Sequence, residues 1–145
     1  MKREKFLWLL TQSHHRALVT AKRIRERLST PGGEGELADE ARRLYDEELR
    51  LHFWDEEKIL ALYEERMGQE EPEPQRIRRD HRRLESLLTQ SDRRSLLEFA
   101  ELLTSHVRFE EDVLFGRIEE VLGAKDKLTV DAFLKAIPLG QACAT

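Results

Sequence analysis

Two nine-residue stretches of the chain share one pattern, HFWDEEKIL at residues 52–60 and HVRFEEDVL at residues 106–114. In both, a histidine precedes a Glu-Glu pair by four residues, and a β-branched residue and a leucine follow the pair. Positions four apart lie on the same face of an α-helix, about 5–6 Å apart at Cβ. Each stretch therefore predicts a helix that directs an imidazole and a carboxylate into the same space.

Helical periodicity extends outward from both stretches and recurs twice more along the chain. The expected helices span residues 2–28, 37–67, 74–88 and 92–123. Their boundaries coincide with helix-breaking or capping residues. These residues are Pro31, Gly32 and Gly33 after the first helix, Gly68 and Pro72 after the second, Pro74 in the first turn of the third, Ser91 or Asp92 as the cap of the fourth, and Gly123 at its end.

The predicted fold is all-α, because strand signals are absent and the amphipathic helices are long. Four such helices with short connections predict an antiparallel up-down-up-down four-helix bundle over residues 1–123. On the fourth helix, Val113 is expected on the apolar face. Residues 124–145 are expected to form a short C-terminal helix and a tail, with the helix at residues 130–137, capped by Thr129 and ended by Pro138.

Composition excludes several classes of protein. The 145 residues suffice for about one domain, and the formal charge is −4 with histidines neutral. An acidic balance gives no reason to expect nucleic acid, and the arginines of residues 76–83 are expected to face solvent. No apolar run approaches the ~20 residues that span a membrane. Cys143 is the only cysteine, so no internal disulfide is expected and a cytoplasmic location is predicted.

The remaining histidines complete the pattern. His81 lies on the apolar stripe of the third helix with Glu85 four residues later, which repeats the spacing of the two opening stretches. On the first helix His14 and His15 compete for the inward position. The stripe that includes Leu10 and Ala17 favours His14, with His15 as the alternative.

Burial of this many imidazoles and carboxylates points to a metal site. Without a counter-charge, such burial costs several kcal/mol per ion, and divalent cations remove that cost. The alternative is a polar core of hydrogen-bonded His–Glu pairs. Six or seven nitrogen and oxygen ligands exceed the four that one tetrahedral zinc takes, and they suit two metals that share carboxylates. Imidazole with carboxylate favours iron, manganese or zinc.

The ordered set of motifs resembles the hemerythrin family, specifically its HHE cation-binding branch. The set consists of an inward histidine on the first helix, H-F-x-x-E-E on the second, a histidine on the third and H-x-x-x-E-E on the fourth, and it spans about residues 6–122. The resemblance implies a non-heme di-iron centre within a four-helix bundle. By position it implies Glu56 and Glu110 as bridging carboxylates, His14 and His52 as ligands of one iron, and His81, Glu85 and His106 as ligands of the other.

The resemblance also implies a function. The iron with five protein ligands would keep a position for dioxygen or another small diatomic, in oxygen, redox or iron sensing or handling, with manganese or zinc as substitute metals. Oxygen-carrying hemerythrins have a histidine where this chain has Glu85. A carboxylate there favours the ferric state, which weakens the case for reversible oxygen carriage. A di-iron enzyme with peroxidase-like or nitric-oxide-reducing activity and a metal-structured interaction module are the alternatives. The alternative for Glu85 is an ordinary acid on the surface of the helix.

Three further acids are expected to support the ligands rather than to bind metal. Glu48 lies one turn before His52 and is expected to hydrogen-bond the free ring nitrogen of that histidine. Glu57 and Glu111 are the second members of the Glu-Glu pairs. Their positions are rotated away from the apolar stripe, so a solvated or supporting role is expected. No protein partner is indicated.

Overall fold

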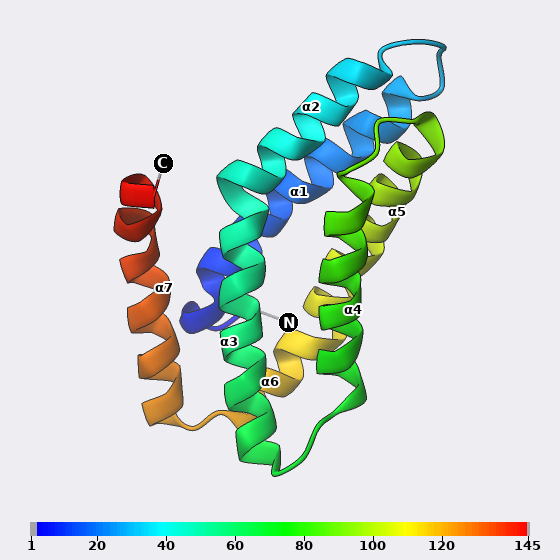
Figure 1. The fold of residues 1–145 in the computed structure, drawn as a ribbon. Helices are drawn as coiled ribbons and strands as arrows, with labels where there is room; N and C mark the ends of the chain where they lie inside the picture. Colours follow the sequence, from blue (N-terminus) through cyan, green and yellow to red (C-terminus); the bar gives the residue numbers. More distant parts are fainter. Residues whose placement is uncertain (1–2, 145) are drawn as a thin grey trace.

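A computed structural model describes the backbone of residues 3–144 and the side chains of residues 3–134, and the described backbone is helical and contains no strand (Figure 1). The elements are η1 (Lys5–Leu7), α1 (Trp8–Arg27), α2 (Glu34–Leu44), η2 (Tyr45–Leu49), α3 (Arg50–Met67), α4 (Pro72–Leu87), α5 (Arg93–Phe109), η3 (Glu110–Leu114), α6 (Phe115–Val121) and α7 (Ala124–Ala144).

The second and fourth expected helices are each continuous, but each contains one π-helical turn. The turn η2 joins α2 to α3, and η3 joins α5 to α6 (Figure 1). A π turn has five residues where an α turn has about four, so it rotates the faces of the helix that follows it. This explains why Leu44 and Leu49, five residues apart, are both buried, and why Val113 is 41 % exposed rather than part of the apolar face.

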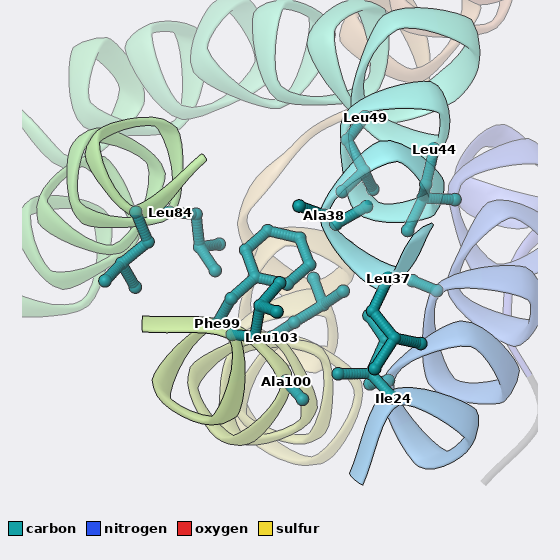
Figure 2. Close-up of a cluster of buried hydrophobic side chains, with 14 of the residues drawn as sticks. Ile24, Leu37, Ala38, Leu44, Leu49, Leu84, Phe99, Ala100 and Leu103 are labelled. Carbon is teal, nitrogen blue, oxygen red and sulfur yellow. The ribbon is translucent and has the colours of Figure 1, made fainter. Parts of the chain in front are cut away.

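One hydrophobic cluster, here called the Phe99 core, fills the end of the molecule near the α1–α2 connection (Figure 2). Small residues on α1 and α5 allow these helices to pack closely along their length. The buried members of the cluster are Ala17, Ala21, Ile24, Leu37, Ala38, Ala41, Leu44, Leu49, Phe53, Leu84, Leu87, Leu96, Phe99, Ala100, Leu103 and Val107.

A second cluster, here called the Phe115 core, fills the other end of the helices. Its buried members are Phe6, Leu7, Leu10, Ile59, Leu60, Tyr63, Ile77, Leu114, Phe115, Ile118, Leu122, Val130 and Leu134. In chain order, α1 runs from the Phe115 core to the Phe99 core, and α3 runs back to the Phe115 core. The helix α4 runs in the same sense as α1, and the continuous helix α5–η3–α6 runs in the same sense as α3. Each helix crosses from one core to the other at the predicted metal ligands.

Local signals fix the connections between helices. Of the two candidate caps, Asp92 is the one used, since its side chain accepts a hydrogen bond of 3.1 Å from the backbone N–H of Ser95. Gly33 and Gly68 adopt φ values of 82° and 79°, a left-handed conformation that favours glycine. The third helix begins at Pro72, two residues before the expected start at Pro74.

The prediction of a short C-terminal helix at residues 130–137 is wrong. Helix α7 begins at Ala124 and extends to Ala144. Thr129 does not cap it, because its hydroxyl donates to the carbonyl of Lys125 one turn back. Pro138 lies inside the helix; a proline removes one backbone hydrogen bond without necessarily ending a helix. The helix packs beside α3 and η1 (Figure 1), where Asp126 accepts two hydrogen bonds from Arg66, at 2.7 and 2.8 Å.

Candidate metal centre

Six of the seven predicted ligands gather in a polar layer between the two hydrophobic cores. They come from four separate helical stretches, and each side chain is at most 5 % exposed. The residues are His14 on α1, His52 and Glu56 on α3, His81 on α4, His106 on α5 and Glu110 at the start of η3. His15, the alternative to His14, is exposed on the other face of α1. Helical periodicity therefore chose correctly between the two neighbours.

These six side chains form two overlapping groups that could each hold a metal ion. One group consists of His14, His52, Glu56 and Glu110, and the other of Glu56, His81, His106 and Glu110. Within each group the candidate ligand atoms all lie within 4.8 Å of one another. Both groups share the same two glutamates, so each potential ion has two imidazoles of its own and two carboxylates in common with the other.

Glu56 spans the two groups through its two oxygens. Its Oε2 lies 2.8 Å from Nε2 of His52, and its Oε1 lies 2.9 Å from Nε2 of His81. The first of these contacts joins residues four apart on one helix, as the opening pattern predicts. The second joins α3 to α4 and connects the two histidine pairs.

Glu110 is the second shared carboxylate, and its side chain is buried. Its Oε1 lies 2.9 Å from Nε2 of His14 and 3.3 Å from Nε2 of His106. Neither oxygen of Glu110 takes part in a hydrogen bond, and neither does Nε2 of His106. Buried polar atoms without partners are costly and rare. A divalent cation would satisfy all three atoms, so the donor set fits a metal.

The outer ring nitrogens of three histidines are held by carboxylates. Glu111 lies 2.6 Å from Nδ1 of His14, and Glu57 lies 2.8 Å from Nδ1 of His81. Both glutamates thus lie where they can support a ligand, one of the two roles expected for them. Such contacts fix the ring orientation and direct Nε2 inward, as metal-binding histidines require.

The third supporting carboxylate was not foreseen. Asp80 on α4 lies 3.1 Å from Nδ1 of His106 on α5. Nothing in the spacing of two residues 26 positions apart indicates such a contact; the only available signal was that Asp80 directly precedes the inward His81. The bond expected between Glu48 and His52 is not formed, since Nδ1 of His52 has no partner. Glu48 lies in the π turn η2, which changes its rotation relative to α3.

Glu85 lies outside both groups. Its side chain is exposed and accepts a hydrogen bond from the hydroxyl of Tyr45. Burial and the neighbouring Glu85 carboxylate raise the pKa of Tyr45 above its usual range. The four-residue spacing from His81 brings Glu85 near the layer along the helix, but its carboxylate is turned toward η2. The structure therefore unites six of the seven predicted metal ligands.

The charges of the layer are strongly coupled. Burial lowers the pKa of His14, but the surrounding carboxylates, led by Glu110, outweigh that effect and raise it well above its ordinary value. The same opposition, again with Glu110 as the main carboxylate, raises the pKa of His106. For Glu56, burial acts to raise the pKa, but the neighbouring histidines, His52 foremost, hold it well below its usual range. Protons thus serve as counter-charges that a metal ion would displace.

Apolar side chains surround the layer. The ring of Phe53 stacks on His81 with 3.9 Å between centroids, and Phe115 stacks on His14 at 5.4 Å. Leu10, Ile59, Leu60, Leu114 and Ile118 close the side of the two shared glutamates that faces the Phe115 core. Such walls limit access of water to the centre.

The sequence matches a known protein family. A family model described as the hemerythrin HHE cation-binding domain matches residues 6–118. The chain belongs to the hemerythrin family. Searches of curated proteins and of solved structures found no match. The matched range contains all six residues of the two groups as well as Asp80 and Glu111. None of the helices in its described part is long and apolar enough to span a lipid bilayer.

Proposed function

We propose that this hemerythrin is a non-heme di-iron protein that binds dioxygen or another small diatomic, in oxygen, redox or iron handling. The observation that carries the proposal is the sharing of Glu56 and Glu110 by two pairs of histidines. Two carboxylates common to two histidine pairs suit a pair of ions rather than one. Imidazole and carboxylate donors without a thiolate suit iron, with manganese or zinc as substitutes.

The proposed scaffold is an antiparallel up-down-up-down four-helix bundle. Its support is the alternating order in which successive helices pass the Phe115 and Phe99 cores. This alternation brings one histidine-bearing turn from each helix to the same level. The α7 helix would then be an addition to the outside of the bundle.

The residues of this centre have different roles. The iron pair, when bound, supplies a redox-active site for a small ligand. His14, His52, His81 and His106 would hold the ions from four helices, and Glu56 and Glu110 would hold both at once. Glu111, Glu57 and Asp80 keep three of the rings in place through their Nδ1 atoms. The apolar walls keep water away from the shared carboxylates.

Metal analysis with an anaerobic-to-air optical titration tests the proposal. After anaerobic reconstitution we expect about two irons per chain, and admission of air should produce charge-transfer absorption that a zinc-loaded sample lacks. His14→Ala should bind fewer irons, whereas His15→Ala, its exposed neighbour, should match the wild type. Iron that is not stoichiometric even after reconstitution would overturn the proposal. Sustained consumption of peroxide or nitric oxide would instead identify an enzyme.

A further inference from the structure

A pocket of about 250 Å³ lies beside the centre, between α1, η2, α3 and the Leu134 side chain of α7. It is open to solvent, and His52 forms part of its wall. Of its lining residues the argument uses Leu9, Leu10, Ser13, Glu48, His52 and Asp55. Since Nε2 of His52 faces Glu56 at 2.8 Å, the imidazole ring separates this pocket from the metal centre.

Three residues of this wall carry buried polar atoms without hydrogen-bond partners. These atoms are Nδ1 of His52, Oε2 of Glu48 and Oδ1 of Asp55. Both His52 and Asp55 are at least 95 % buried. Among the described residues, the other side-chain atoms in this condition are one nitrogen of Arg3 and three atoms of the metal centre. Unpartnered atoms thus concentrate in the metal centre and in the residues that line this pocket.

His52 differs from the other three histidines of the centre. Their Nδ1 atoms each have a carboxylate within 2.6 to 3.1 Å, whereas Nδ1 of His52 has none. On the outer side of three of the histidine rings lies a carboxylate. On the outer side of the fourth ring, that of His52, lies the pocket. This is the position at which a solute in the pocket can come nearest to the ligand atoms.

The lining selects the charge of that solute. An anion would meet the carboxylates of Glu47, Glu48 and Asp55. A small apolar molecule would leave the three polar atoms unsatisfied. Two cations lie nearby, Arg16 at 3.3 Å from Oε1 of Glu48 and Lys58 at 3.5 Å from Oδ1 of Asp55, and they offset only two of the three acids. A hydrated cation has the charge that these acids attract and is small enough for a pocket of about 250 Å³.

We propose that this pocket is the route by which divalent cations reach the centre from solvent. The carboxylates of Glu48 and Asp55 attract the hydrated ion. The ring of His52 separates the pocket from the shared glutamates, so the ion must pass this ring to reach them. The inference rests on the proposed function, because it requires that the centre take up metal.

Stopped-flow mixing of the apo-protein with Co²⁺ tests the route through the rate of uptake rather than through activity. The double variant Glu48→Gln/Asp55→Asn should take up Co²⁺ about tenfold more slowly at low salt and reach the same final stoichiometry. The difference should shrink at 0.5 M salt, because salt screens the attraction. The matched control is Glu36→Gln/Asp39→Asn on α2, which removes the same charge from acids that are 86 % and 71 % exposed, and it should behave as the wild type.

A second variant tests the route without a change of charge. Ser13→Leu puts a larger apolar side chain into the pocket and should slow uptake at every salt concentration. If the double variant loses helical circular dichroism, Ser13→Leu decides alone. If the wild type takes up two ions and the folded variants take them up at the same rate, the proposed route is wrong and the proposed function still stands. Absence of uptake by the wild type would overturn the proposed function itself.

Discussion

Asp80 and His106 join neighbouring helices at the metal layer, with 3.1 Å between Oδ2 of the aspartate and Nδ1 of the histidine. The contact directs Nε2 of His106 toward the shared Glu110. Asp80 also directly precedes His81, so one turn of α4 supplies a ligand and the support of another. The two helices therefore hold the histidine pair of one candidate ligand group as a unit.

Replacing Asp80 should weaken metal binding without abolishing it. Loss of a carboxylate that supports a ligating histidine lowers metal affinity about 10- to 100-fold. We expect that range for Asp80→Asn, measured by competition with a chromophoric chelator. Asp39→Asn, at an exposed site on α2, is the control and should bind as the wild type does. Equal affinities for the two variants would show that Asp80 does not position His106.

The contact between His52 and Glu56 within one α-helix was predictable from the sequence, and the contacts between helices were not. His52 and Glu56 meet at 2.8 Å because four-residue spacing is a property of the α-helix. Glu111 reaches His14 across 97 residues, a distance that depends on how two helices pack. The π turns escaped prediction because periodicity assumes a constant number of residues per turn. That assumption put Val113 on the wrong face.

Glu85 illustrates the limit of spacing arguments. It stands four residues after His81, as Glu56 does after His52, yet its carboxylate is bonded to Tyr45 and lies outside both ligand groups. A neighbouring donor on η2 decides its direction, and no pattern along α4 reveals that donor. The four long helical segments and the six inward candidate ligands could thus be derived from the sequence, but the direction of the Glu85 side chain could not.

Substitution of two glutamates tests whether Glu85 is a metal ligand. Glu85→Gln should leave the metal stoichiometry at two ions and change the affinity by no more than about twofold. Glu57→Gln should lower the affinity about tenfold, since Glu57 supports His81 through Nδ1 at 2.8 Å. Both substitutions remove one charge from the same side of the molecule, so each serves as the control of the other. If Glu85→Gln binds one ion fewer than the wild type, Glu85 is a metal ligand after all.

The Phe99 core should determine the stability of the scaffold independently of metal. Leu103 on α5 is fully buried in that core, whereas Leu97 on the same helix is 40 % exposed. We expect Leu103→Ala to lower the free energy of unfolding by about 2–5 kcal/mol, and Leu97→Ala by less than about 1 kcal/mol. Urea unfolding in the presence of a chelator measures both. Similar losses for the two variants would contradict the packing described here.

The shifted pKa values predict how the stability of the chelator-treated protein depends on pH. Glu110 and the other carboxylates raise the pKa of His14 and His106 in the folded state. Their contribution to stability is complete below the unfolded value of about 6.5 and is lost as pH rises through the folded values. The lowered pKa of Glu56 has the opposite sign, since its contribution is present above about 4.3 and is lost as pH falls. Stability should therefore be greatest between about pH 4.5 and 6.5.

Metal should reverse the upper part of this profile. Ligands bind a metal in their deprotonated form, so the ion replaces the protons that His14 and His106 carry in the metal-free protein, and its contribution falls as pH drops. The urea midpoint of the chelator-treated protein should decrease from pH 5.5 to pH 9, and that of the metal-loaded protein should increase from pH 5.5 to pH 7.5. His106→Gln should flatten the first trend, whereas His15→Ala should leave it unchanged. A midpoint that rises with pH in both samples would mean that the buried histidines are neutral without metal.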